Sequence, residues 1–203
     1  MEGLIFDKEH EGVIIEAYRA LCANVLATLG EKKVVEFASV ADASNTSAVV
    51  SNLGIALAQV GKSVLIIDCN LRNPKQYELF GVSNRGIVDC VSSGEPYTTF
   101  VQATKQENLF VLAAGVVGGS PTETLLSKEM QTLLQDAKEI YDVILLDVPP
   151  VATVNDAIAL GTQTDGVLLI VTNKQDKVEQ AQKAKEMFTQ AGVTVLGCIL
   201  DKA

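Results

Sequence analysis

The stretch that decides the fold is VVEFASVADASNTSAVVSNLGIALAQV, which runs from Val34 to Val60. It opens with the apolar run VVEFASV and continues through the short polar segment ADASNTS. It ends in AVVSNLGIALAQV, where apolar residues recur at helical spacing. We therefore expect a buried strand that leads through a turn directly into a helix.

The same alternation of strand and helix patterns continues outward along the chain. Apolar, β-branched runs predict strands at Val34 to Val40, Val64 to Asp68, Leu109 to Ala113, Val143 to Asp147, Val167 to Thr172 and Val195 to Leu200. Periodic segments between them predict helices at Val13 to Leu29, Ser47 to Val60, Ser127 to Glu139 and Lys177 to Ala191. Strands that are apolar throughout are typical of a parallel sheet covered on both faces, so we expect a doubly wound, mostly parallel α/β fold. We expect one domain over residues 1–203, with residues 1–30 as a helical region that is a candidate oligomerisation element.

The composition limits the classes of function. The chain has 203 residues, of which 48% are hydrophobic, and its 16 basic against 25 acidic residues give a net charge of −9. This charge argues against general nucleic-acid binding and against unaided adhesion to anionic lipid. We identify no apolar run close to the roughly 18 residues that span a bilayer. We expect a cytoplasmic protein that reaches the membrane only through a partner.

Two features are expected to be structural. Cys22, Cys69, Cys90 and Cys198 are far apart and lack C-x-x-C spacing, so we expect reduced, mostly buried side chains rather than a zinc site or disulfides. The segment GVVGGSP at residues 115–121 lacks G-x-G-x-x-G and basic residues, which favours a flexible surface connection over a phosphate loop.

The turn after the first strand occupies the place of a phosphate-binding loop. In such a loop, backbone N–H groups and a helix N-terminus surround phosphates while a lysine neutralises their charge. Here Thr46 stands where the lysine is expected, Ala43 and Asn45 stand where glycines are expected, and Ser47 keeps the magnesium-binding hydroxyl. The candidate nucleotide-binding residues of the loop are Ala43, Ser44, Asn45, Thr46 and Ser47.

Two later strands end in an aspartate. VLIIDCNLRNP places Asp68 at the end of one strand, and VILLDVPP places Asp147 at the end of another. The carboxyl ends of parallel strands share one edge of a sheet, so both carboxylates are expected near the loop. They are candidate catalytic groups and, with Ser47, candidate Mg²⁺ ligands. The alternative is that each aspartate only ends its strand and caps the following turn.

These segments together resemble the cytoplasmic domain of the bacterial tyrosine kinases, relatives of the MinD and ParA ATPases found with capsule and exopolysaccharide export systems. The resemblance extends from Glu16 to Asp201 and implies a P-loop NTPase-like fold. It is carried by EAYRALCANV, SNLGIALAQVGKSVLIIDCNLRNPKQYELFGV, GIVDCVSSGE, SPTETLLSKEM and YDVILLDVPPVATVNDAIAL.

The resemblance also implies roles for single residues. Asp68 corresponds to the catalytic aspartate, Asp147 to the aspartate on the magnesium side, and Asp156 to an acidic position after the third motif. In the D-x-D-x-R pattern, Asn70 replaces the second aspartate and Arg72 is kept as a candidate nucleotide-binding residue. An alternative for Arg72 is a structural or partner-facing ion pair.

The resemblance further implies an assembly. The oligomerisation motif E-x-x-R-x-x-R is matched by Glu16 and Arg19, with Cys22 at the third place. These two residues are candidate interface residues, and the alternative is a local surface pair. The family's C-terminal tyrosine cluster has no counterpart among the four dispersed tyrosines Tyr18, Tyr77, Tyr97 and Tyr141. The alternatives are that a longer chain carries this tail or that the protein lacks it. The implied partner is a membrane-anchored polysaccharide co-polymerase, or chain-length determinant, subunit, and we expect a monomer or dimer.

The altered loop leads to one main hypothesis. We expect a degenerate, catalytically inactive relative of the kinases that takes no nucleotide cofactor and acts as a scaffold or regulatory partner in polysaccharide assembly. The alternative is an active ATP- and Mg²⁺-dependent tyrosine kinase or ATPase with a divergent loop. A partition or division-site ATPase is disfavoured, because SPTETLLSKEM and EAYRAL resemble the kinase branch.

Two short matches to other nucleotide motifs are rejected. Gly61-Lys62-Ser63 reads GKS, but a strand follows it instead of a helix, so we expect a turn. Residues 173–176 read NKQD, similar to a guanine-reading motif, but the phosphate lysine that should accompany it is missing.

Overall fold

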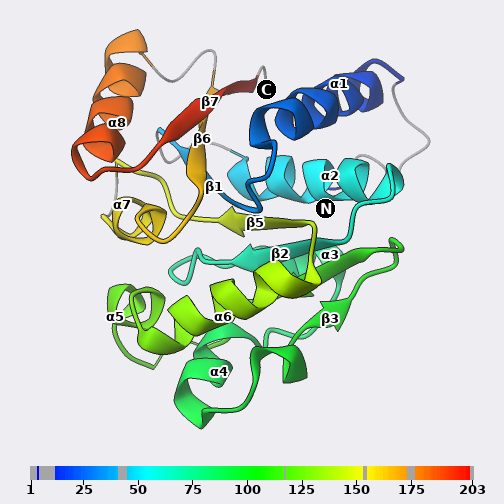
Figure 1. The fold of residues 1–203 in the computed structure, drawn as a ribbon, viewed down its shortest axis with the longest axis vertical. Helices are drawn as coiled ribbons and strands as arrows, with labels where there is room; N and C mark the ends of the chain where they lie inside the picture. The colour runs from blue at the N-terminus through cyan, green and yellow to red at the C-terminus, as the bar shows by residue number, and fades with distance from the viewer. Residues whose placement is uncertain are drawn as a thin grey trace.

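The protein is built around one seven-stranded sheet (Figure 1). Its structure is a computed structural model that describes Leu4 and residues 12–40, 45–116, 118–152, 155–172 and 177–201. The order of the strands across the sheet is β3-β4-β2-β5-β1-β6-β7. The strands are β1 (Val34–Ser39), β2 (Val64–Asp68), β3 (Gln102–Ala103), β4 (Leu109–Leu112), β5 (Val143–Asp147), β6 (Gly166–Thr172) and β7 (Val195–Asp201).

The sheet is parallel except at one edge. β1 pairs in parallel with β5 and β6, β2 pairs in parallel with β4 and β5, and β6 pairs in parallel with β7. Only the short β3 runs antiparallel to its neighbour β4 among the described strands. Every residue of β1, β2 and β5 is buried, as expected for strands with helices on both faces.

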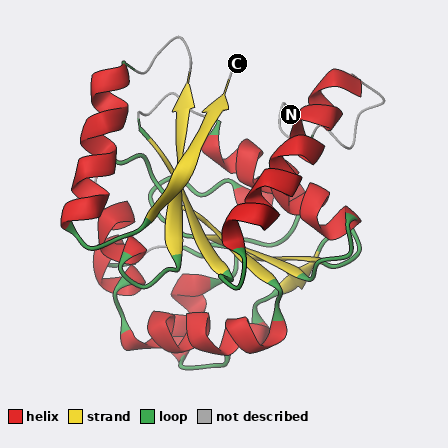
Figure 2. Cartoon of the chain, turned by 45° about the horizontal axis from the view of Figure 1, so that its top comes forward, coloured by secondary structure: helices red, strands yellow, loops and turns green. Residues whose placement is uncertain are grey.

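Helices cover both faces of this sheet (Figures 1 and 2). α1 and α2 pack with one set of buried strand residues, and α4 to α8 contribute to a second apolar cluster on the other face. The helices are α1 (Gly12–Leu29), α2 (Thr46–Gln59), α3 (Gln76–Phe80), α4 (Ile87–Ser93), α5 (Pro121–Leu125), α6 (Lys128–Ile140), α7 (Asp156–Gly161) and α8 (Val178–Gln190), with a 3₁₀ turn, η1, at Tyr97–Thr99.

The doubly wound, mostly parallel α/β fold expected from the sequence is confirmed. The six predicted strands and four predicted helices are present, with ends that differ by at most one residue. The sequence pattern missed β3 and the short helices α3, α4, α5 and α7. Elements of two to seven residues are too short to show a periodicity in the sequence. Only residues that favour the start or end of a helix, such as N-caps, can indicate them. One such signal is Ser120, which accepts a hydrogen bond from the Glu123 N–H at the start of α5.

One expectation about the N-terminal helix was wrong. By length and composition alone, α1 is apolar enough to cross a membrane, with a mean hydropathy of 1.4 over its 18 residues. Its only charged residues are Glu16 and Arg19, so the apolar run is longer than the sequence reading recognised. Cys22, Val25 and Leu29 are buried in the cluster that α1 shares with α2.

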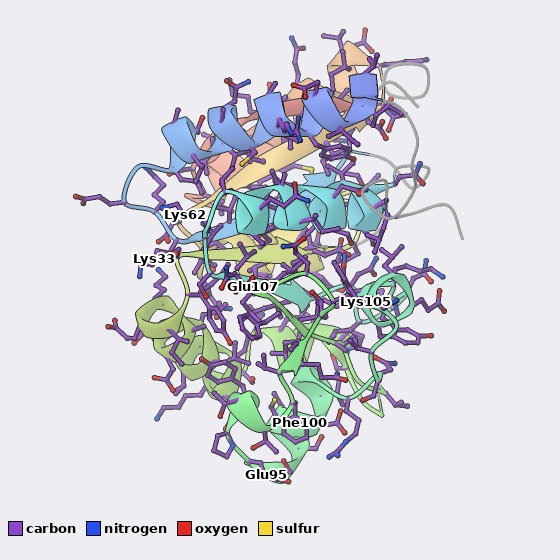
Figure 3. The ribbon with its side chains drawn as sticks, turned by 90° about the vertical axis from the view of Figure 1, so that its right-hand side faces the viewer. Lys33, Lys62, Glu95, Phe100, Lys105 and Glu107 are labelled. Carbon is purple, nitrogen blue, oxygen red and sulfur yellow. The ribbon has the colours of Figure 1, made fainter. Side chains whose placement is uncertain are left out.

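The remaining expectations concern the cysteines and the GKS match. The four cysteines are free; Cys22, Cys69 and Cys90 are buried and Cys198 is exposed. Val60 and Gly61 form a turn after α2, in which Gly61 has a positive φ of 85°, and Lys62 follows this turn before β2. Figure 3 shows Lys62 close to Lys33 at the end of α2 that is farthest from its first residue, Thr46. Residues 173–176, which read NKQD, lie outside the described residues.

A buried glutamate lies in the central strand. Glu36 on β1 is fully buried, and neither of its carboxyl oxygens has a hydrogen-bond partner among the described residues. Its neighbours are tightly packed, because a Cβ added at Gly161 would lie 3.1 Å from Glu36 Oε2. Burial raises the pKa of Glu36 well above its ordinary value of 4.5, so the folded protein favours the protonated, neutral form.

This shift makes stability depend on pH in a defined direction. The unfolded chain releases the Glu36 proton near pH 4.5 and the folded chain retains it, so the free energy of unfolding falls as pH rises above that value. We expect Glu36→Met to remove this loss, so that the variant gains about 1 kcal/mol or more over the wild type at pH 8 and less at pH 5. Urea unfolding at both pH values measures the difference, and Glu139→Met, an exposed site on α6, is the control. An equal difference at both pH values would contradict the assignment.

Candidate functional site

The two aspartates predicted to converge lie side by side at the carboxyl edge of the sheet. Asp68 ends β2 and Asp147 ends β5, and the two residues are register partners across these neighbouring strands. Both side chains are fully buried. The strand pairing therefore brings together two carboxyl groups that the sequence separates by 79 positions, with little water to solvate them.

Backbone N–H groups from the following loop surround Asp68. Its Oδ1 accepts a hydrogen bond from the N–H of Asn70 at 3.2 Å. Its Oδ2 accepts from the N–H groups of Lys75 and Gln76, both at 2.9 Å. Asp68 thus holds the loop after β2 and the first residue of α3 in place. This is the capping role that the sequence analysis gave as the alternative to a catalytic role.

Side chains supply the hydrogen bonds to Asp147. Gln76 Nε2 donates to Asp147 Oδ2 at 2.7 Å, and the Ser47 side chain also bonds to this carboxyl group. Asp147 Oδ1 is buried and has no hydrogen-bond partner among the described residues. Ser47 and Asp147, both predicted as Mg²⁺ ligands, are therefore in direct contact.

Gln76 is a site residue that the sequence reading missed. Its side chain is fully buried although it begins a short helix near the surface. Besides Asp147, its amide Nε2 contacts the carbonyl oxygen of Ser47 at 3.1 Å, and its Oε1 accepts from Ser51 Oγ at 2.7 Å. A glutamine eight positions after an aspartate carries no motif, so only the folded chain shows its place.

Burial controls the protonation of the aspartate pair. It raises the pKa of Asp68, and the neighbouring charge of Asp147 raises it further, against the effect of the three N–H bonds. Burial also raises the pKa of Asp147, and the bonds from Gln76 and Ser47 lower it in part. Burial and the like charge of its neighbour therefore favour the protonated form of this pair, at Asp68 in particular.

The predicted phosphate loop is described only at its end. Ala43 and Ser44 lie outside the described residues. Asn45 is exposed and precedes α2, Thr46 is buried as its first residue, and Ser47 is partly buried. Thr46, at the place of the expected lysine, carries a short neutral side chain and supplies no positive charge there.

Comparisons with known proteins place this arrangement in a family. Residues 33–201 match the ParA family, described as the NUBPL iron-transfer P-loop NTPase. The sequence is 33% identical to the tyrosine-protein kinase YwqD of Bacillus subtilis, over 92% of this chain and 80% of the relative. The chain belongs to the bacterial tyrosine kinase family.

Other members of this family agree in sequence and in structure. The tyrosine-protein kinase CpsD of Streptococcus pneumoniae is 29% identical, over 92% of this chain and 83% of the relative. Among solved structures, the chimerical protein CapA2B2 superposes with a TM-score of 0.92 and 26% identity, over 100% of this chain and 91% of the other. The resemblance to the kinases stated from the sequence motifs is thus confirmed.

The arginine kept from the family's D-x-D-x-R pattern is in an ion pair. Arg72 Nε donates to Asp156 Oδ2 at 2.9 Å; the Arg72 side chain is 45% exposed and that of Asp156 only 3%. Asp156 Oδ1 accepts from the Thr122 hydroxyl at the start of α5. Three family segments, after β2, at α5 and at α7, are therefore joined through one buried carboxylate. Asn70 acts locally instead, and its Oδ1 accepts from the N–H of Asn73 at 3.3 Å.

The residues at the three positions of the family's oligomerisation motif differ in exposure in this chain. Glu16 and Arg19 form an ion pair on the exposed surface of α1. Cys22, at the third motif position, is buried against α2. A residue that faces the protein core is not available to a neighbouring subunit.

The candidate metal ligands do not fit Mg²⁺ in this arrangement. Mg²⁺ prefers about six oxygen ligands in octahedral geometry. Here the amide nitrogen of Gln76 faces Asp147, the Ser47 hydroxyl bonds to the same carboxyl, and Asp68 is bonded to backbone N–H groups. No group of three or more His, Cys, Asp or Glu side chains able to hold a metal ion occurs in the described part of the chain.

The Arg72–Asp156 pair predicts a measurable coupling energy. Arg72→Ala leaves the Asp156 carboxylate buried with Thr122 as its remaining side-chain partner, so we expect a loss of about 1 to 2 kcal/mol in the free energy of unfolding. In a double-mutant cycle with Asp156→Asn, the coupling should be about 1 kcal/mol. Chemical unfolding measures it, and Thr122→Val reports the hydroxyl alone. Additivity within about 0.3 kcal/mol would show that the pair contributes nothing specific.

Proposed function

We propose that this chain is a catalytically inactive member of the bacterial tyrosine kinase family that acts as a scaffold or regulatory partner in capsule or exopolysaccharide assembly. The observation that carries the proposal is Thr46 at the position of the phosphate-binding lysine. A kinase of this type depends on positive charge at that point to hold the phosphates and to stabilise the charge that develops during transfer.

The size of the expected loss supports inactivity. A charge-assisted hydrogen bond is worth about 1.5 to 3 kcal/mol, so losing the lysine weakens nucleotide binding by about tenfold to a hundredfold. Removing a preorganised group that stabilises the transition state lowers the rate by a further ~10² to 10³. Ala43 and Asn45 add side chains where the loop backbone should approach the phosphates, and Asp42 adds a repelling charge.

The state of the remaining site residues supports the same proposal. Asp68 accepts hydrogen bonds from backbone N–H groups, and Asp147 accepts hydrogen bonds from the side chains of Gln76 and Ser47. The retained Arg72 bonds to Asp156 rather than to an exposed anion site. Each group that family chemistry would use already has an internal partner that stabilises the fold.

The proposed partner is a membrane-anchored polysaccharide co-polymerase subunit, met on the cytoplasmic side of the membrane. The net charge of −9 disfavours direct binding to anionic lipid, so recruitment would depend on a protein. The solved relative CapA2B2 is a chimera of the same fold, and its name combines a CapA and a CapB part.

The second candidate function is an active ATP-dependent kinase or ATPase. One observation favours it: Ser47, Asp68 and Asp147 remain together at the carboxyl edge, where Asp147 Oδ1 has no hydrogen-bond partner among the described residues. In this case a second chain would supply the missing positive charge, and Mg²⁺ binding would require the site to rearrange.

Nucleotide titration separates these two functions. We expect calorimetry to detect no ATP or ADP binding by the wild type at millimolar nucleotide and Mg²⁺. The double variant Asn45→Gly, Thr46→Lys should bind at least about tenfold more tightly, because it restores one glycine and the lysine. Thr189→Lys, at an exposed position on α8, adds the same charge away from the site as a control. ATP hydrolysis by the wild type that Asp68→Asn abolishes would overturn the proposal.

Light scattering tests the proposed assembly state. With Glu16 and Arg19 paired to each other and Cys22 buried, the charged motif offers little to a neighbour, and we expect a monomer or dimer. A stable octamer of the wild type that Arg19→Ala dissociates would show that α1 forms a ring interface.

A further inference from the structure

The Gln76 side chain bonds both to Asp147 and to the first turn of α2. Nε2 lies 2.7 Å from Asp147 Oδ2 and 3.1 Å from the Ser47 carbonyl oxygen, and Oε1 accepts from the Ser51 hydroxyl at 2.7 Å. The two N–H groups and the carbonyl of the amide are therefore all engaged. The Ser51 hydroxyl shares its one proton between Gln76 Oε1 and the Ser47 carbonyl oxygen, each 2.7 Å away. Each polar atom of the buried Gln76 amide thus has a partner, which stabilises its position.

The backbone of the same residue holds the side chain in place. The N–H of Gln76 donates to Asp68 Oδ2, as does the N–H of Lys75. α3 therefore begins at a point fixed by one carboxyl, and its first side chain extends to the other. Gln76 thus contacts both aspartates of the register pair, one through its main chain and one through its side chain.

The amide of Gln76 faces oxygen atoms of the kinds that a cation binds. An amide NH₂ carries partial positive charge and donates toward oxygen atoms, as a metal ion accepts electron pairs from them. Here it faces a carboxylate oxygen and a carbonyl oxygen, both ligand types that divalent cations use. It differs from a cation because it is neutral.

We propose that Gln76 is a built-in neutral cross-link that takes the place of a divalent cation between Asp68, Asp147 and Ser47 and excludes such a cation from this site. The inference deepens the proposed function and rests on it, because it names the group that closes the metal end of the inactive site. The excluded ligand class is a small divalent cation with a preference for oxygen ligands.

Replacing the amide by a carboxylate tests the cross-link. In Gln76→Glu, three carboxyl groups meet in a buried site, so we expect a lower melting temperature in chelator and a recovery when Mn²⁺ or Mg²⁺ is added. Mn²⁺ titration followed by electron paramagnetic resonance should show no saturable site in the wild type. The variant should bind at least about tenfold more tightly than the wild type. Gln131→Glu, which adds the same charge on the exposed face of α6, should behave like the wild type.

Removing the side chain gives a second, independent measurement. Gln76→Ala leaves Asp147 and the Ser47 carbonyl without their shared donor, and Mn²⁺ should bind this variant more tightly than the wild type as well. Wild-type protein that binds Mn²⁺ as tightly as both variants would overturn the inference, because Gln76 would then exclude nothing. Failure of both variants to bind Mn²⁺, or to fold in its presence, would overturn it too, because no cation site would lie behind the amide.

The two proposals fail in different ways. ATP binding or hydrolysis by the wild type overturns the proposed inactivity, whatever Mn²⁺ does alone. Saturable Mn²⁺ binding by the wild type without nucleotide, at the affinity of the variants, overturns the cross-link even if no ATP binds. A wild type that takes up neither, beside a Gln76→Glu variant that takes up Mn²⁺, supports both.

Discussion

The carboxyl edge of the sheet depends on one constraint, which is that Asp68 and Asp147 are buried next to each other. A parallel register between β2 and β5 makes this contact unavoidable. Two carboxyl groups removed from water need donors, a proton or a cation. In this chain, backbone N–H groups satisfy Asp68, while Gln76 and Ser47 supply the donors for Asp147. The path of the chain after β2, the start of α3 and the first turn of α2 all follow from that requirement.

The same contacts are compatible with a loop that lacks the expected lysine. Thr46 stands at the place of that lysine, yet β1 is buried at the centre of the sheet and α2 packs across it. The packing of the core uses the apolar faces of these elements, and the chemistry of a phosphate site uses only their ends. Residues at the ends can therefore change without loss of the core, provided that each buried polar group keeps a partner.

The sequence predicted the long elements and the position of the aspartates, and it missed what connects them. Val64 to Asp68 and Val143 to Asp147 are apolar runs that end in aspartate, so both the strands and the shared edge were predictable. Gln76 was not predictable, because its role depends on the approach of three segments and on no local pattern. The burial of Glu36 was not predictable either. Its apolar neighbours are enough to predict the first strand, and the pattern does not show that a carboxyl group is buried in it. The membrane-like hydropathy of α1 was missed because Glu16 and Arg19 interrupt the apolar run. The mean hydropathy over all 18 residues stays high despite these two charges.

The cross-link proposed at Gln76 would have a consequence for signalling. Kinases and ATPases with a metal–nucleotide site exist in at least two conformations, because the occupant of the site changes with each turnover. An amide that belongs to the chain is present at fixed stoichiometry and carries the same charge at every concentration of free magnesium. If the cross-link forms as proposed, the surface above α2 and α3 would keep one form whatever the energy state of the cell. A binding partner would then respond to the concentration of this protein and not to its nucleotide state.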